Sequence, residues 1–245
     1  MLKKRLIITL TFLDGVLFRT KKFKPDYRYT KNFIDLFSID ELILIDISKK
    51  KFSPNFLEII NYFSKNCFVP ICVGGGIKEL THADNYFQIG ADKVLIGTSL
   101  INEKNVVGQM VNKYGSQAII QSIDIKKKDR KYALYSNSGR KLEKIDPLTA
   151  IEEATNNKVG EILINNIDLD GSLLGYDIEI INKLKTKANC PLLALGGAGN
   201  WQHFTDLFFK TDISAVCTQN IFHFTEESII SAKKFLKNKK INIRI

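Results

Sequence analysis

The chain has few of the residues that build metal centres and disulfide frameworks. It contains four cysteines, with no CxxC pair among them, and three histidines that form no ligand cluster. Cys72, Cys190 and Cys217 lie in or beside predicted buried strands, where reduced thiols act as small apolar side chains. The sequence therefore predicts no disulfide, no metal site and no cofactor.

Long hydrophobic runs are also missing. No stretch reaches the roughly 18 uninterrupted apolar residues that a membrane-spanning helix needs. The first residues, MLKKRLIITLTFLDG, begin with basic residues as a signal peptide does. However, their apolar run is short, alternates with threonine and lacks a cleavage-type ending. We therefore expect a β-strand here, a cytoplasmic protein and no membrane partner.

Positive charge is abundant, but it follows no pattern typical of nucleic-acid binding. The chain has 36 lysines and arginines against 26 acidic residues, a formal net charge of +10. Lysines are scattered, and runs of three occur only at residues 49–51 and 126–128. Since no RNA- or DNA-binding motif accompanies them, the charge indicates either a solvated surface or attraction for phosphorylated metabolites.

Two glycine-rich segments, one in each half of the chain, resemble each other. Residues 70–100 and 191–221 each contain an apolar strand, a Gly-Gly turn, an amphipathic helix and a second apolar strand. Such copies predict two repeated half-barrels, about 1–115 and 116–245, each with a phosphate-binding turn. The alternative is two unrelated loops that both need glycine.

The order of predicted elements favours a (β/α)₈ barrel, an α/β fold that one domain of 245 residues can form. Predicted strands, mostly rich in Ile, Leu and Val, lie at residues 5–12, 41–47, 69–73, 93–96, 118–124, 161–165, 192–195 and 215–218. Predicted helices include residues 54–64, 80–89, 147–156 and 177–185. A doubly wound open sheet is the alternative, but FLDGV after the first strand is not the glycine fingerprint it would need.

Two further features concern the ends of the predicted strands. Residues 131–136 look like a hairpin inserted after the fifth strand, with residues 17–23 as a counterpart after the first. Charged side chains begin four of the apolar strands: Arg5, Glu41, Lys93 and Glu161. They fall on the amino-terminal rim of the barrel. Two positive and two negative charges favour a paired ring that closes or gates this end, although solvated charges are common there.

Several motifs together resemble one enzyme family. RLIITLTFLDG, DELILIDIS, VGGGIKE, GADKVLIGTS, GEILINNIDLDGSLLGYD, LGGAGN and IFHF look like the cyclase subunit of imidazole glycerol phosphate synthase, HisF. The resemblance covers the whole chain. It implies a (β/α)₈ barrel with two phosphate sites at the top and a HisH-like glutaminase docked at the bottom. It also implies that the quartet of Arg5, Glu41, Lys93 and Glu161 is the ammonia gate.

The phosphate positions of that family match unevenly. In the first half Gly76 and Thr98 correspond, while Gly97 replaces an asparagine. In the second half three residues of the motif are kept and a small alanine-serine pair is replaced. The kept residues are Asp170, Gly171 and Gly197, and the replacements are Gln219 and Asn220. Backbone N–H groups do much of the phosphate holding at such turns, so we expect an anion in at least the first half.

Four other residues are candidate substrate contacts. Asp46 ends the second predicted strand, where it binds substrate or caps the next turn. Gly196 belongs to the second Gly-Gly turn. Asn165 and Ser138, the latter followed by Gly139, match positions near the second phosphate site, although turn chemistry explains them nearly as well.

The candidate catalytic residues depart from the family. The family uses two aspartates, at the ends of the first and fifth strands, which divide proton donation and acceptance between them. Asp124 is present in SIDIK, but Thr11 stands at the other position, and Arg19 replaces the lysine of the loop that follows. A threonine hydroxyl has no usable pKa near neutrality. Losing one member of the pair removes a factor of roughly 10² to 10⁴ in rate.

The chain keeps the charged quartet but only one of the two catalytic aspartates. In this it resembles the HisF-like, glycosyl amidation-associated (WbuZ-type) branch. In that branch the first-strand motif is also non-acidic, and a segment like RTKKFKP follows it. This resemblance implies partnership with a HisH-like glutaminase and an N-acetyl sugar amidotransferase that forms an amidine in surface polysaccharide. One alternative is a true cyclase of histidine biosynthesis. Another is a non-catalytic scaffold that activates the glutaminase.

Overall fold

The structure is a closed barrel of eight parallel strands. The computed structural model describes residues 3–29, 38–49, 52–97, 105–219 and 229–244. Its barrel strands are β1 (Arg5–Leu13), β4 (Glu41–Asp46), β5 (Ile71–Gly74), β6 (Lys93–Ile96), β7 (Ile119–Lys128), β10 (Glu161–Asn166), β11 (Leu192–Leu195) and β12 (Ala215–Thr218). Each pairs with the next in this order, β12 pairs with β1, and all these pairings are parallel. The predicted (β/α)₈ barrel is confirmed.

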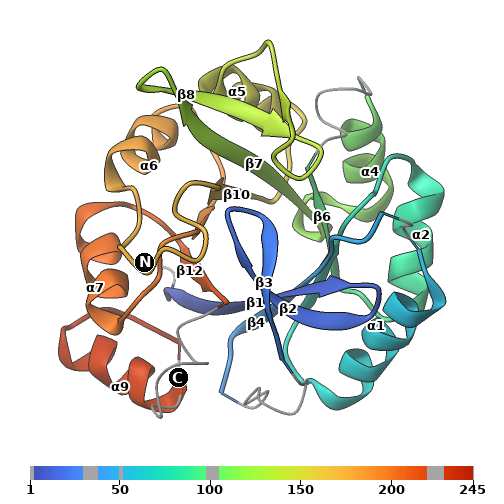
Figure 1. Cartoon of the computed structure of the whole chain (residues 1–245), viewed down its shortest axis with the longest axis horizontal. Helices are drawn as coiled ribbons and strands as arrows, with labels where there is room; N and C mark the ends of the chain where they lie inside the picture. Colours follow the sequence, from blue (N-terminus) through green and yellow to red (C-terminus); the bar gives the residue numbers. More distant parts are fainter. Residues whose placement is uncertain (1–2, 30–37, 50–51, 98–104, 220–228, 245) are drawn as a thin grey trace.

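Helices surround the barrel as an outer ring (Figure 1). They are α1 (Pro54–Asn66), α2 (Leu80–Ile89), α4 (Val106–Tyr114), α5 (Pro147–Asn156), α6 (Ile178–Lys185), α7 (Trp201–Lys210) and α9 (Ile229–Asn238). Their starts follow from local sequence. Ser53 and Asp146 accept hydrogen bonds from the first turns of α1 and α5, and each is followed by a proline, whose fixed φ suits that position. The four predicted helices are confirmed to within two residues.

The alternation of side chains along the strands divides the core in two. Leu6, Ile8, Leu10 and Phe12 of β1 point outward and pack under the helices. Ile7 points inward, into a separate cluster on the barrel axis. That inner cluster consists of Ile7, Ile43, Cys72, Leu95, Ile120, Leu163, Leu193, Ala215 and Cys217. Because the side-chain period of a strand is two, Arg5, Thr9 and Thr11 also face the barrel interior.

Two antiparallel ribbons extend from barrel strands. β2 (Val16–Lys21) folds back on β1, from Leu13↔Val16 to Thr11↔Phe18, and β3 (Lys24–Arg28) pairs with β2. β8 (Lys131–Ser136) folds back on β7 as far as Asp124↔Tyr135, and the short β9 follows it at residues 141–142. Both predicted ribbons are confirmed, whereas β3 and β9 were not predicted. Figure 1 shows β2 and β3 near the centre of the ring.

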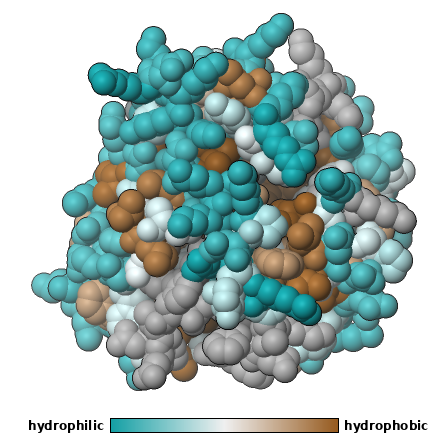
Figure 2. Space-filling view, in the orientation of Figure 1, coloured by the Kyte–Doolittle hydropathy of each residue, from teal (hydrophilic) through white to brown (hydrophobic). Residues whose placement is uncertain are grey.

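Hydrophilic side chains cover most of the face seen in Figure 1, with separate hydrophobic areas between them (Figure 2). Within the described ranges, none of the helices combines the length and the apolar character that crossing a membrane requires.

Candidate functional site

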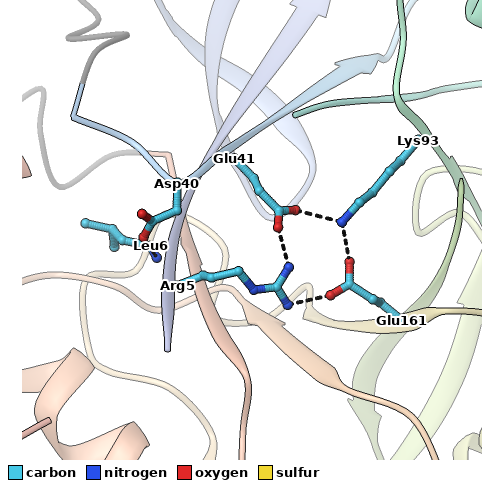
Figure 3. Close-up of polar contacts among 6 residues, drawn as sticks. All are labelled: Arg5, Leu6, Asp40, Glu41, Lys93 and Glu161. Atoms are coloured by element: carbon cyan, nitrogen blue, oxygen red, sulfur yellow. Dashed lines mark hydrogen bonds and ion pairs between the residues drawn. The ribbon is translucent and has the colours of Figure 1, made fainter. Parts of the chain in front are cut away.

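The amino-terminal rim of the barrel carries a closed ring of ion pairs (Figure 3). Arg5 starts β1 and uses its two terminal nitrogens to bridge Glu41, at the start of β4, and Glu161, at the start of β10. Lys93, at the start of β6, completes the ring: its Nζ lies 3.0 Å from Oε2 of Glu41 and 2.8 Å from Oε2 of Glu161. Each cation thus contacts both carboxylates, and each carboxylate contacts both cations.

The ring is largely removed from water, so its charges depend on one another. The side chains of Glu41 and Glu161 are only 5% and 10% exposed. Burial acts to raise the pKa of Glu161, but Arg5 and Lys93 outweigh it and hold that pKa below its usual value. Burial acts to lower the pKa of Lys93, and Glu161 and Glu41 outweigh it and raise that pKa. Glu161 and Lys93 are therefore charged near neutral pH, and Glu161 and Glu41 also raise the pKa of Arg5.

Above the ring, the inner apolar cluster fills the next layers of the barrel. Its nine members are at most 6% exposed. Above Ile7 on β1 comes Thr9, which is 1% exposed and whose Oγ1 has no hydrogen-bond partner among the described residues. Polar side chains return only at this level, so the barrel interior runs from charged through apolar to polar along its axis.

Asp124 lies at the opposite, carboxyl-terminal end. Its Oδ1 accepts hydrogen bonds from Oγ of Ser122 at 2.8 Å and from Nδ2 of Asn165 at 3.3 Å. Burial raises the pKa of Asp124 to about 6, against the opposing effect of these two donors. A carboxyl group with such a pKa can both accept and return a proton near neutral pH, as a general base must. The Oδ1 atom of Asn165 is buried without a partner among the described residues.

Thr11 faces the barrel interior on β1 and is 5% exposed. It lies at the point where β1 begins to pair with β2, as Asp124 lies where β7 begins to pair with β8. The two residues therefore occupy corresponding places in the two ribbons. A hydroxyl stands in one half and a carboxyl with a raised pKa in the other.

Both glycine turns pack against the backbone at the end of a neighbouring strand, since a Cβ on Gly75 would lie 2.4 Å from the Asp46 carbonyl oxygen. In the first half Gly75 and Gly76 have positive φ, which glycine adopts without strain. A Cβ placed on Gly97 would meet no heavy atom within 4 Å in the described part of the chain. Thr98 lies outside the described residues. As far as the described residues go, the space beside Gly97, just after β6, is therefore open.

The second half is filled by neighbouring backbone. Gly197 has φ +108° and packs directly on the carbonyl of Gly175, whose N–H donates to the Gly197 carbonyl at 2.7 Å. A Cβ on Gly196 would lie 2.5 Å from the Asn166 carbonyl oxygen, and one on Gly171 would lie 2.6 Å from that of Thr20. Asn220 lies outside the described residues.

The remaining predicted residues divide between turns and contacts. Asp46 is 2% exposed, and its Oδ1 accepts a hydrogen bond from the Ser48 N–H at 2.9 Å, which is the turn-capping geometry. Ser138 and Gly139 have φ of +56° and +73° in the turn between β8 and β9. Asn165 contacts Asp124, as described above. The described part of the structure shows no close contact of Ser138 or Gly139 with the second glycine turn.

The sequence analysis missed a polar cluster beneath the first ribbon. Thr20 of β2 has its Oγ1 3.1 Å from Oδ1 of Asp170 and 3.3 Å from Oε1 of Gln219. It also missed the pair of Asp40 and Lys233, 2.7 Å apart and almost fully buried beside the ring. A partial signal existed for Ser122, which lies two residues before Asp124 and so on the same face of its strand.

Comparison with known proteins places the chain in one family. The family model described as "Histidine biosynthesis protein" matches residues 11–228. Proteins named imidazole glycerol phosphate synthase subunit HisF are similar over most or all of the chain. That of Chlorobium limicola is 38% identical over 84% of this chain and 82% of its own length. Those of Chlorobium phaeobacteroides and Natranaerobius thermophilus are each 34% identical over 100% of both chains. With its closed eight-stranded barrel, the chain therefore belongs to the HisF-like histidine biosynthesis protein family.

Proposed function

We propose that this chain is the ammonia-receiving, HisF-like synthase subunit of a glutamine amidotransferase complex. The observation that carries the proposal is the closed ring of Arg5, Glu41, Lys93 and Glu161 at one end of a barrel whose other end holds Asp124. Its relatives are named as subunits of a synthase, which supports a role in a complex. The proposed partner is a HisH-like glutaminase that docks over the ring and releases ammonia there.

The bonding pattern of the ring supports a gate. Arg5 bridges Glu41 and Glu161 by itself, through separate nitrogens. If Lys93 leaves the ring, each carboxylate therefore keeps its ion pair with Arg5. Lysine is also the more mobile of the two, because its ammonium is a point charge on a flexible stem whereas the planar guanidinium of Arg5 is held as a fork. We propose that Lys93 is the moving member.

The apolar layer supports a path for neutral ammonia. Moving a charged ammonium through the cluster around Ile7, Leu95 and Leu163 would cost far more than moving a neutral molecule. An ammonium ion that arrives must therefore lose its proton before it enters the apolar layer. The Oγ1 of Thr9, which has no partner among the described residues, then offers the first hydrogen bond above the apolar layer.

At the mouth, we propose that ammonia reaches an acceptor beside Asp124. The preferred acceptor is the acetamido group of an N-acetyl sugar, activated by a separate amidotransferase and converted to an acetamidino group for surface polysaccharide. Thr11 supports this preference because it places a hydroxyl where the pair of catalytic aspartates implied for the cyclase has its second carboxylate. Ammonia forms the new C–N bond to the carbon of the activated amide, the C–O bond breaks as the amide oxygen leaves with its activating group, and Asp124 takes up the proton that the nitrogen releases.

The second candidate is the cyclase of histidine biosynthesis, which joins ammonia to phosphoribulosyl-formimino-aminoimidazole carboxamide ribonucleotide. The names of the relatives favour it. In this case Asp124 acts alone, or with water held by Thr11. A third candidate, a scaffold that only activates the glutaminase, leaves Asp124 without a role.

One experiment separates these candidates. Purified protein is given the phosphoribulosyl-formimino substrate and excess ammonium salt, which bypasses the glutaminase. Imidazole glycerol phosphate formed at enzyme-like rates would establish the histidine-pathway cyclase. Absence of product from folded protein would favour another acceptor, and co-expression with a HisH-like glutaminase then tests the complex. A single peak of both chains on size exclusion is expected, and separate peaks would contradict the partnership.

A further inference from the structure

The first ribbon is fastened across the second half of the barrel mouth. Gln219, in line with the inward-facing Cys217 of β12, donates its side-chain N–H to the Phe18 carbonyl at 2.6 Å. Its Oε1 lies 3.3 Å from Oγ1 of Thr20. Gln219 is 8% exposed and Thr20 is 6% exposed, so both contacts are sheltered from water. One side chain thus holds β2 at two points.

Asp170 fastens the ribbon from a different loop. Its Oδ1 lies 3.1 Å from Oγ1 of Thr20, and its Oδ2 accepts the Phe23 N–H at 2.9 Å. Its carbonyl accepts the Lys22 N–H at 3.2 Å. The next residue, Gly171, lies so close to the ribbon that a Cβ there would be 2.6 Å from the Thr20 carbonyl oxygen. The backbone of the ribbon therefore lies directly on the loop that follows β10.

The turn between β8 and β9 adds a contact from the other ribbon. A Cβ on Gly139 would lie 3.2 Å from Cδ2 of Phe23 and 3.1 Å from Cδ1 of Ile167. The tip of the first ribbon is thus enclosed by three different loops. Among the described residues, no comparable contact lies beside Gly97 in the first half.

We propose that Gln219 is a specificity-determining residue: by clamping the β2–β3 ribbon onto Asp170 and Gly171, it closes the loop that follows β10, in the second half of the mouth, to anions. The mouth then accepts a ligand with one phosphate or other anionic group and rejects a ligand that places a second anion in the second half. This inference rests on the proposed function only in treating the mouth as the acceptor site.

The test counts inorganic phosphate bound to the full-length chain by equilibrium dialysis at fixed ionic strength. We expect at most one phosphate per chain for the wild type and one more for Gln219→Ala. Gln219→Asn, whose side chain is one methylene shorter, should behave like the alanine variant. Gln202→Ala removes an exposed glutamine that pairs with Asp206 on α7, and it should match the wild type.

Hydrogen exchange of the ribbon gives a second readout. Amides of residues 16–28 should exchange at least several-fold faster in Gln219→Ala than in Gln202→Ala, with unchanged exchange in β5 and β6. Two phosphates on the wild type, or no added phosphate in Gln219→Ala, would overturn the inference. Failure of the proposed function would show instead as absence of a glutaminase complex, and it would leave the phosphate count unchanged.

Discussion

The Nζ atom of Lys93 lies 2.8 Å from Oε2 of Glu161, which joins β6 to β10 across the floor of the barrel. Neither strand is the other's neighbour, because β7 lies between them. This contact therefore spans the opening itself. Removing it opens the floor without breaking a strand pairing.

Lys93→Ala is expected to uncouple the two reactions of the complex. With the glutaminase present, glutamate release should continue while product formed per glutamine falls, because ammonia escapes through the open floor. The measurement compares glutamate and product in the same assay. Lys187→Ala removes an ion pair with Glu152 in which both side chains are about half exposed, and it should leave coupling intact. Unchanged coupling in Lys93→Ala would exclude this lysine as the gate.

Asp124→Asn is expected to abolish product formation if the barrel performs chemistry. The wild-type rate should rise with pH through about 6, where Asp124 loses its proton. The variant should show no such titration. If product formation is unaffected, the barrel only conducts ammonia. Asp212→Asn, at a side chain that is 80% exposed, is the control.

The same carboxyl group predicts a pH dependence of stability. Its pKa is raised in the folded state, so the folded protein holds that proton more tightly than the unfolded chain does. The contribution of this proton to the free energy of unfolding should therefore be fully present below about pH 4 and lost as the pH rises through about 6. Asp124→Asn lacks this contribution at every pH. Urea unfolding of both proteins at pH 4 and pH 7 measures the difference. An equal difference at both pH values would contradict the raised pKa.

Lys233→Met should destabilise the fold by about 3–5 kcal/mol, because it leaves the buried Asp40 carboxylate without its cation. Asp40 would keep one partner, the Leu6 N–H at 2.7 Å. Lys234→Met, at the next and exposed position of α9, should change stability by no more than about 0.5 kcal/mol. Chemical denaturation provides the comparison. Equal effects of the two substitutions would show that the Asp40 pair adds nothing.

Alanine should have unequal effects at Gly97, just after β6, and at Gly197, in the second glycine turn. Gly97→Ala adds a methyl group to open space, so its melting temperature should stay near that of the wild type. Gly197→Ala needs a left-handed φ and drives the methyl group into the Gly175 carbonyl, so it should lower the melting temperature strongly or prevent folding. Similar melting temperatures would mean that Gly197 is no more tightly packed than Gly97.

Local sequence was enough to locate the barrel elements. The strands that begin at Arg5, Lys93 and Ala215 are buried on both faces, so nearly every residue is apolar and the signal is strong. The end of β7 was placed four residues too early. Its last part, from Ile125 to Lys128, leaves the barrel to pair with β8 and is lysine-rich, which hides it from a search for apolar runs.

Contacts between distant loops could not be predicted in the same way. Thr20 and Gln219 are 199 positions apart, and Asp40 and Lys233 are 193 apart. Nothing in LFRTKKF marks a threonine that will meet Asp170. The sequence alone does not distinguish Lys233 from the other lysines of its basic helix. Only the closure of the barrel, which brings β12 beside β1, places these residues together.

The corresponding positions of Thr11 and Asp124 give the mouth a direction. If both ribbons carried the same side chain there, a long ligand could lie across the barrel either way with nearly equal free energy. With a hydroxyl on one side and a proton acceptor on the other, a ligand that is turned around presents its reacting atom to the wrong group. A scaffold of two similar halves thereby distinguishes the two ends of whatever it binds.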